Sequence, residues 1–195
     1  QVADGTTLHP AICAAPLCLL KYLRNGSADA TFGTAGRVAI PTINGFAPEL
    51  GGRIARQSDG KLLLSAACSN TIIAYRALCL LRFTPNGGID SSFGNGGVVP
   101  ISIGPYGNAI PGDVKIGADG KILVTGSCQE LGTFYQYRMQ NACAARVTPE
   151  GNLDSTFGDA GTFIRVRSLG INPSESTASL VEILPDGAVI FIGYC

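Results

Sequence analysis

Seven cysteines are the residues of this chain best placed for chemistry. Four of them lie nine residues beyond the aspartate of an Asp-Gly pair, namely Cys13, Cys68, Cys128 and Cys195. The others open the similar segments CLLKYL, CLLRFT and CAARVT, namely Cys18, Cys79 and Cys143. Cysteines matched in position favour structural disulfides, which persist outside the cytosol. We expect Cys13 to pair with Cys18, Cys68 with Cys79 and Cys128 with Cys143, and we expect Cys195 to be available for a bond to another chain.

Catalysis or metal binding has little support in the residue types. His9 is the single histidine, so one chain cannot assemble a histidine-dependent triad or a multi-histidine metal site. Four glutamates that offer acid groups occupy non-equivalent places without a motif: Glu49, Glu130, Glu175 and Glu182. A cysteine-based zinc site lacks a second close pair to join Cys13 and Cys18. We therefore expect no enzymatic activity and no cofactor.

A phrase repeated three times, at a period near sixty residues, supplies a second set of candidates: NGSADATFGTAG, NGGIDSSFGNGG and EGNLDSTFGDAG. Its aspartates, Asp29, Asp90 and Asp154, can accept hydrogen bonds from backbone amides one to three residues on. One carboxylate per turn falls short of the six to eight oxygens of a calcium site, so the turn-forming role is favoured. The phenylalanines of the phrase are expected to be buried between neighbouring units: Phe32, Phe93 and Phe157.

The elements that position these residues are expected to be strands. Segments such as RIARQ, KLLLSAAC, ALCLLRF and VVPISI are short, apolar and bounded by turn residues. The Asp-Gly pairs at Asp59, Asp119 and Asp186 supply the positive φ angles of tight hairpins between first and second strands. A third strand starts at the second cysteine of each pair, and a fourth follows the Phe-Gly turn. Each cysteine pair therefore joins a second strand to a third.

Four-stranded units that repeat indicate an all-β, β-propeller-like array of about three blades with half-blades at each end. The chain is expected to form a single repeat domain over residues 1–195. Its units cover approximately residues 1–50, 51–110, 111–175 and 176–195. An open stack of the same units is the alternative architecture.

Composition limits the partners. The net charge is zero and no lysine or arginine cluster occurs, which argues against nucleic acid. No apolar run approaches the ~20 residues of a membrane-spanning helix. Charged residues make up 14% of the chain, against about 25% in a typical soluble domain, so we expect part of the surface to be covered by assembly. The cysteines favour a secreted or cell-surface protein.

The phrases GGIDSSFGNGG, GNLDSTFGDAG and ADGKILVTG resemble the bacterial delta-60 repeat family, and the resemblance extends over nearly the whole chain. It implies a secreted or surface protein of propeller-like architecture, and it carries over no catalytic motif. The paired cysteines are not part of the usual family pattern.

Counting strands leads to the functional hypotheses. Propellers usually have four to eight blades, and this chain is too short to close comfortably alone. The strands from Ser179 to Cys195 could complete the amino-terminal blade, but the segment from Asp4 to Cys13 would compete for the second-strand place, so one strand is surplus. A surplus strand can be donated to a neighbouring subunit, so the leading hypothesis is a structural subunit of a surface filament. One alternative is a ligand-binding module, for glycan or protein, that uses loop aromatics: Tyr106, Phe134, Tyr135 and Tyr137. Another is a fragment of a longer repeat protein.

Overall fold

A computed structural model of the chain describes residues 7–12, 17–70, 75–130, 140–165 and 179–193. All regular secondary structure within these ranges is β-strand, as expected. The strands in chain order are β1 (Thr7–Ile12), β2 (Leu17–Tyr22), β3 (Arg37–Ala39), β4 (Ala47–Arg56), β5 (Leu62–Ser69), β6 (Ala77–Phe83), β7 (Val98–Ile101), β8 (Tyr106–Ile116), β9 (Ile122–Glu130), β10 (Gln140–Val147), β11 (Thr162–Arg165), β12 (Leu180–Ile183) and β13 (Val189–Ile192).

The strands form four antiparallel sheets, which correspond to the repeated units. Two sheets are complete, with the orders β4-β5-β6-β7 and β8-β9-β10-β11. A three-stranded sheet, β1-β2-β3, holds the places of the second, third and fourth strands, and a two-stranded sheet, β12-β13, holds the first and second places. The expected all-β, propeller-like repeat fold is thereby confirmed.

The first strands begin earlier than the approximate unit boundaries at 51 and 111, because β4 starts at Ala47 and β8 at Tyr106. Both strands carry two register shifts against the second strand of their sheet, around Pro48 and Gly51 in β4 and around Gly107 and Pro111 in β8. Bulges of this kind let a strand continue through glycine and proline that would otherwise end it. The segments before RIARQ and DVKI are therefore parts of strands.

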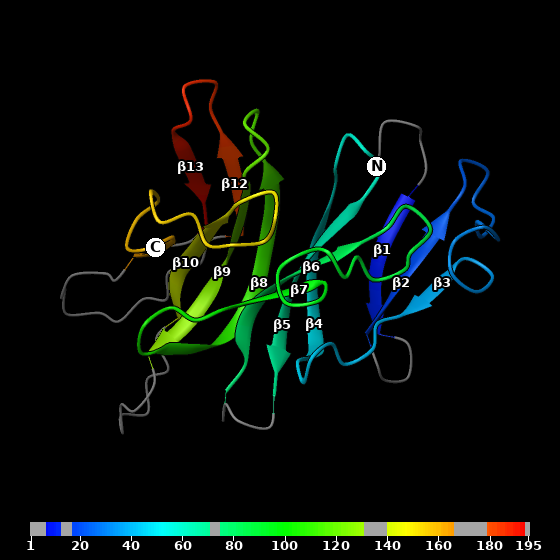
Figure 1. Cartoon of the computed structure of the whole chain (residues 1–195), viewed down its shortest axis with the longest axis horizontal. Coiled ribbons are helices and arrows are strands. Elements are labelled where there is room, and N and C mark those ends of the chain that lie inside the picture. The colour runs from blue at the N-terminus through cyan, green and yellow to red at the C-terminus, as the bar shows by residue number, and fades with distance from the viewer. Residues whose placement is uncertain (1–6, 13–16, 71–74, 131–139, 166–178, 194–195) are drawn as a thin grey trace.

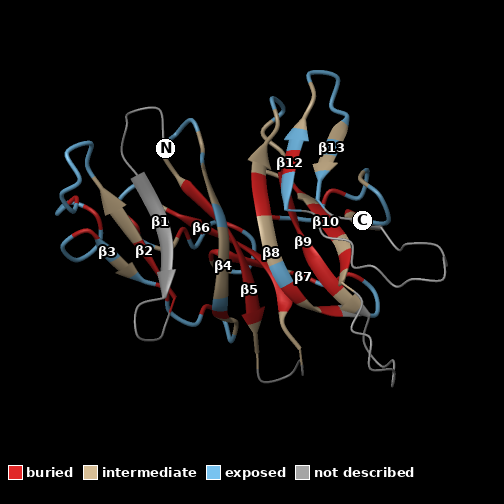
Figure 2. Cartoon of the chain, turned by 180° about the vertical axis from the view of Figure 1, so that it is seen from behind, coloured by how far each residue is buried: buried red, intermediate tan, exposed pale blue. Residues whose placement is uncertain are grey.

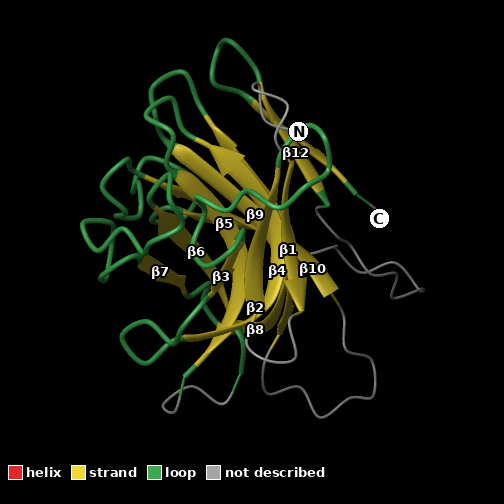
Figure 3. Ribbon diagram, turned by 90° about the vertical axis from the view of Figure 1, so that its right-hand side faces the viewer, coloured by secondary structure: helices red, strands yellow, loops and turns green. Residues whose placement is uncertain are grey.

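The sheets follow one another along the longest axis of the molecule (Figure 1). The sheet β1-β2-β3 lies at one end of this row and β12-β13 lies at the other, and the view from behind agrees (Figure 2). Seen along the row, the strands of the successive sheets overlap, with loops projecting to one side (Figure 3). The described part of the chain is therefore an open row of sheets.

The buried residues lie mainly on the strands of the inner sheets (Figure 2), and they form three clusters between successive sheets. One cluster joins β2 and β3 to β5 and β6, and it contains Phe32 and Phe83. A second joins the two complete sheets and contains Phe93 and Val147. A smaller third cluster, around Val181, joins β9 and β10 to β12 and β13. Each sheet is thus stabilised chiefly by its neighbours, as in other repeat proteins.

Two of the expected disulfides are confirmed. Cys68 on β5 bonds Cys79 on β6, and Cys128 on β9 bonds Cys143 on β10, with 5.9 Å between the Cα atoms in each pair. The two cysteines of each pair are not directly opposite each other on the two strands. The residue opposite Cys68 is Ala77, two positions before Cys79, so the two side chains lie on the same face of the sheet at a diagonal, and Cys128 and Cys143 are arranged in the same way. Cys18 on β2 is also disulfide-bonded. Cys13 and Cys195 lie outside the described residues.

No helix suited to crossing a membrane is found in the ranges that the structure describes.

Candidate functional site

The aspartates of the repeated phrase form one structural motif, here called the Asp turn, after the third strand of three sheets. The Oδ1 atom of Asp29 accepts hydrogen bonds from the amide and hydroxyl of Thr31, at 3.0 and 2.6 Å. Asp90 accepts the same two bonds from Ser92, and Asp154 accepts them from Thr156. Each bonding residue lies two positions on, within the span expected for an Asx-type turn.

In the two complete sheets, the second carboxylate oxygen of the Asp turn binds two cationic side chains, one from the third strand and one from the residue just before the second strand. Asp90 Oδ2 lies 2.8 Å from Arg82 Nε and 3.1 Å from Lys61 Nζ. The equivalent Asp154 Oδ2 lies 2.6 Å from Arg146 Nε and 3.0 Å from Lys121 Nζ. These bonds tie the second strand, the third strand and the turn after it into one unit.

In the first sheet Lys21 performs the cationic role, with its Nζ 2.8 Å from Asp29 Oδ2. The four other cations, Lys61, Arg82, Lys121 and Arg146, were not singled out from the sequence. A signal was present, since lysine recurs two residues after Asp59 and Asp119 in SDGKLLL and ADGKILV. Each of the described Asp turns therefore has both oxygens occupied by donors of its own chain.

These contacts keep the turn carboxyls ionised. The hydrogen bond from Lys21, with those from Thr31, lowers the pKa of Asp29 from 3.8 to about 2. Burial acts to raise the pKa of Asp90, but hydrogen bonds from Ser92 and Lys61 outweigh it, and the pKa lies well below its ordinary value. At Asp154 the bonds from Thr156 and Lys121 also lower the pKa well below that value. The function that this arrangement serves is to hold the turn in one geometry.

The cation of each Asp turn also lies against the phenylalanine of the same phrase. The guanidinium of Arg82 lies 4.2 Å from the centre of the Phe93 ring, and that of Arg146 lies 5.0 Å from the Phe157 ring. Phe93 is fully buried, and so is Phe32 in the first turn. Phe157 is only partly buried, and it belongs to the smallest of the three clusters. The third turn therefore differs from the other two in what covers its aromatic ring.

Backbone contacts join the first two Asp turns to the following sheets. The Gly33 amide donates to the Asn86 carbonyl at 2.9 Å, and the Gly94 amide donates to the Glu150 carbonyl at the same distance. Arg82 adds a bond from Nη1 to the Pro149 carbonyl at 2.6 Å. In both cases the accepting carbonyl belongs to the turn between the third and fourth strands of the next sheet. The phrase thus connects neighbouring units through atoms that recur in it.

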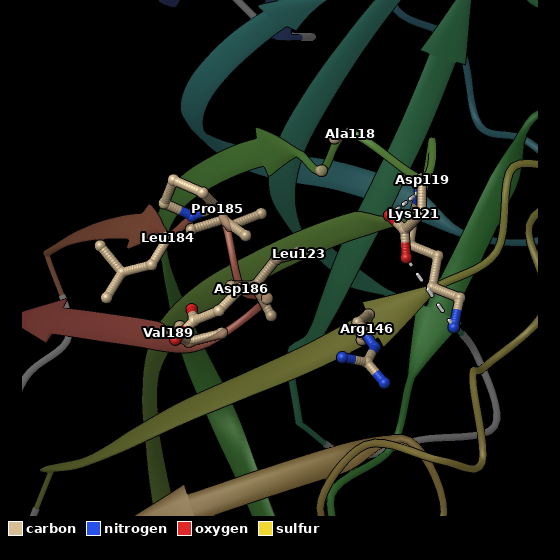
Figure 4. Close-up of a pocket in the computed structure, with 12 residues that line it drawn as sticks. Ala118, Asp119, Lys121, Leu123, Arg146, Leu184, Pro185, Asp186 and Val189 are labelled. Carbon is tan, nitrogen blue, oxygen red and sulfur yellow. Dashed lines mark hydrogen bonds and ion pairs between the residues drawn. The ribbon is translucent and has the colours of Figure 1, made fainter.

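The third copy of this connection differs from the other two, and its Arg146 borders a cavity. Among the described residues, neither the Gly158 amide nor Arg146 Nη1 has a hydrogen-bond partner equivalent to those of Gly94 and Arg82. This cavity of about 240 Å³ lies beside Arg146, between the β8-β9 turn and the β12-β13 turn. Figure 4 shows Lys121 and Arg146 on one side of it and Pro185 and Asp186 on the other.

The Asp-Gly hairpin turns at Asp59, Asp119 and Asp186 need one correction, since only the glycine of each pair has a positive φ. The Gly60 amide donates to the Gln57 carbonyl at 3.0 Å, so the turn closes at the glycine, and φ is +86° there. The aspartate carboxylate instead accepts a hydrogen bond from the amide two residues on, at 2.9 to 3.1 Å in the three turns. The aspartate holds the turn through its side chain and the glycine through its backbone.

The remaining candidates are scattered. Glu49 accepts a hydrogen bond from the Ser69 hydroxyl, and Glu182 lies 3.7 Å from Lys115 Nζ. The two glutamates belong to different sheets, since Glu49 is on β4 and Glu182 is on β12. His9 lies on β1. The proposed ligand loop, with Phe134, Tyr135 and Tyr137, is outside the described residues, as is Glu175. No group of three or more metal-binding side chains is found within the described ranges.

Comparison with known proteins supports the architecture. Residues 57–93 match the model of a family described as a domain of unknown function (DUF5122) beta-propeller. The comparisons with curated proteins and with solved structures gave no match. The matched segment begins at the turn before β5, includes β5, the disulfide and β6, and ends at Phe93. It therefore contains a hairpin turn, a cysteine pair and an Asp turn, and it indicates a family of β-propeller repeats.

Proposed function

We propose that this protein is a non-enzymatic, extracellular structural subunit that forms a filament by exchanging strands between copies. The supporting observation is that the two end sheets are incomplete in complementary ways. The sheet β12-β13 has no described third or fourth strand, and β1-β2-β3 has no described first strand. Strands β2 and β3 of a second copy would complete the β12-β13 sheet, with β13 taking the place of β1 beside β2.

The residues of the competing strands favour this exchange. Both β1 and β13 hold the second-strand place. Pro10 lies within β1, opposite Leu19 of β2, and a proline has no amide hydrogen to donate to a sheet. The sequence of β13, VIFI, has no such gap and consists of good strand formers. Leu17, Leu19 and Lys21 direct their backbone groups to β3, so the gap at Pro10 lies on the edge of β1 that faces away from β2. On the equivalent edge of β13, Ile192 pairs with Leu180 of β12, so replacing β1 by β13 supplies a second strand whose outer edge is paired.

The exposed apolar side chains gather at the ends of the row. Of the six large hydrophobic residues that are exposed in the described ranges, three lie on β12 and β13: Leu180, Ile190 and Ile192. A fourth, Leu23, follows β2 at the other end of the row. Two strands alone make a marginal sheet, and an open apolar edge is prone to pair with another strand. Association between copies would cover this surface.

The cysteines support both the compartment and the exchange. Three of the described sheets carry disulfide-bonded cysteines, which favours an oxidising, extracellular setting. Cys195 follows Asp186 by the spacing that separates Cys13 from Asp4. Since Cys13 is the expected partner of Cys18, β13 in the place of β1 would bring Cys195 to Cys18 instead. Its thiolate can then attack the Cys18 disulfide and release the displaced cysteine as a thiolate, which needs no oxidant. We also infer that the units are delta-60 repeats, on the phrases that resemble that family.

The test compares two lysine substitutions at side chains of similar exposure. Ile192, on β13, is 53% exposed, and Ile110, on β8, is 49% exposed. A charge on an edge strand opposes strand addition. We expect purified protein to form filaments in electron micrographs, Ile192→Lys to raise the concentration needed for assembly, and Ile110→Lys to leave it unchanged.

Disulfide mapping provides a second readout, because peptides that contain Cys18 and Cys195 should be found joined in filaments. A single species at the mass of one chain, at every concentration and without reductant, would refute the proposal. Equal effects of the two lysine variants would show that β13 is not the assembling edge.

A further inference from the structure

The turn between the third and fourth strands occurs in three sheets with the same backbone geometry. The three turns cover residues 23–26, 84–87 and 148–151. In each, the amide of the glycine at the fourth position donates to the carbonyl of the first residue, at 2.9 to 3.0 Å. In each, the amide of the first residue donates to the carbonyl of the residue after the glycine, at 2.7 to 2.8 Å. The turn at 23–26, here called the leading turn, is therefore built like the other two.

The second and third of these turns are covered by the preceding sheet. Gly87 and Gly151 are buried, and a Cβ atom at either position would collide with that sheet. The colliding atoms belong to Val38 and Phe32 in one case and to the Gly94 backbone in the other. The carbonyls of Asn86 and Glu150 meanwhile accept the bonds from Gly33 and Gly94. The turn is thus the part of each sheet that docks on the Asp turn before it.

The leading turn belongs to the sheet at the end of the row, and no sheet precedes it in the described part of the chain. Gly26 is exposed, and a Cβ atom there would meet no heavy atom within 4 Å. Leu23 is 40% exposed. Tyr22, which precedes the turn, is only partly buried, whereas Phe83 and Val147 at the equivalent place are fully buried.

At the other end of the row, the cavity presents the receiving half of the same contact. It is bordered by Arg146, whose equivalent Arg82 binds the Pro149 carbonyl of the following turn. Gly187 also lines it, and a Cβ atom there would meet nothing within 4 Å. At the equivalent glycines of the complete sheets, Pro85 would lie 3.3 Å from a Cβ on Gly60, and Pro149 would lie 3.4 Å from one on Gly120. The cavity therefore takes the place that a docking turn fills in the preceding sheet contact.

We infer that the leading turn of one copy docks in this cavity of a second copy. The Gly158 amide then donates to the Asn25 carbonyl, and Arg146 Nη1 donates to the Arg24 carbonyl. Tyr22 packs on the exposed side of Phe157. This contact rests on the proposed function, since it belongs to the sheet that β12 and β13 of one copy complete with β2 and β3 of the next. The residues of this contact would determine which partner the chain selects.

Three glycines permit a test with matched backbone strain. Gly26, Gly187 and Gly45 have φ angles of +82°, +85° and +84°, and none would bring a Cβ atom within 4 Å of another group. Asparagine is among the residues that best tolerate this region, so each Gly→Asn variant should fold. Gly26→Asn alters only the leading turn, Gly187→Asn alters only the cavity, and Gly45→Asn serves as the control. We expect the first two to raise the concentration of half-assembly at least tenfold relative to the control.

Mixing the two variants adds a readout that misfolding cannot imitate. Every contact between identical copies of either variant has one altered side. In the mixture, the leading turn of Gly187→Asn can dock in the cavity of Gly26→Asn, and the two remaining ends are both altered. We expect the mixture to stop at pairs of one copy each, measured by native mass spectrometry. Failure of the mixture to pair would overturn the inference.

The outcomes separate this inference from the proposed function. Filaments that form equally well from Gly26→Asn, Gly187→Asn and Gly45→Asn would overturn the docking contact and leave strand exchange standing. A wild-type chain that stays monomeric would overturn both, and the two open ends would then be places for further repeats of a longer chain.

Discussion

Truncation of the phenylalanines in the Asp turns tests the idea that each unit is stabilised by the sheet that follows it. Phe93 is fully buried between the two complete sheets and lies 4.2 Å from the Arg82 guanidinium. Replacing a core phenylalanine by alanine costs about 3–5 kcal/mol, so Phe93→Ala should lose about 4 kcal/mol of unfolding free energy. Phe157 holds the equivalent place but is only partly buried, and its ring lies 5.0 Å from Arg146. Because less apolar surface is lost there, Phe157→Ala should cost about 2 kcal/mol.

The assay is urea unfolding followed by far-UV circular dichroism, at a protein concentration below the onset of assembly. With a urea dependence of about 1–3 kcal/mol per molar, the two midpoints should differ by about 1 M. Phe32→Ala is the control, because Phe32 is also fully buried and should match Phe93. The opposite outcome is that Phe157→Ala lowers the midpoint as much as Phe93→Ala does. That result would mean that Phe157 is covered as fully as Phe93, and it would refute the conclusion that no sheet covers the third Asp turn.

Two further predictions concern the disulfides and the Asp turns. Replacing Cys128 and Cys143 together by serine opens a loop of sequence separation 15 and should cost about 3 kcal/mol, read from the urea midpoint; an unchanged midpoint would contradict the stabilising role of the bond. Because the folded pKa of Asp29 is lowered from 3.8 to about 2, its contribution to stability is present above pH 3.8 and is lost as the pH falls through about 2. Asp29→Asn should therefore weaken the dependence of the urea midpoint on pH within that window, and an identical dependence in the variant would refute the assignment.

The parts of the fold that were predictable from the sequence are those that recur at a fixed spacing. Cys68 and Cys79 bond each other because each unit repeats the distance from an Asp-Gly turn to its cysteine, which sets the same hairpin register every time. The Asx geometry of Asp90 was predictable for a related reason, since the side chain bonds groups only two residues away. Local spacing determines both features.

Features that depend on pairing between distant segments were not predictable. Lys61 and Arg82 meet at Asp90 only because β5 and β6 pair in one particular register. The early start of β4 depends on bulges that pairing with β5 supports around Pro48. The contact of Gly94 with Glu150 depends on how two sheets pack, for which the chain offers no local signal.

In the filament that we propose, the disulfides within the sheets would have a mechanical consequence under load. A pulled, unfolded segment lengthens by about 3.3–3.6 Å per residue, but residues enclosed by a disulfide cannot be drawn out. The described bridges enclose separations of 11 and 15 residues, which would otherwise add about 40 and 50 Å of length. Each sheet that carries such a bridge therefore has a limit to its extension, and a stretched fibre would stiffen where a chain without cysteines would continue to yield.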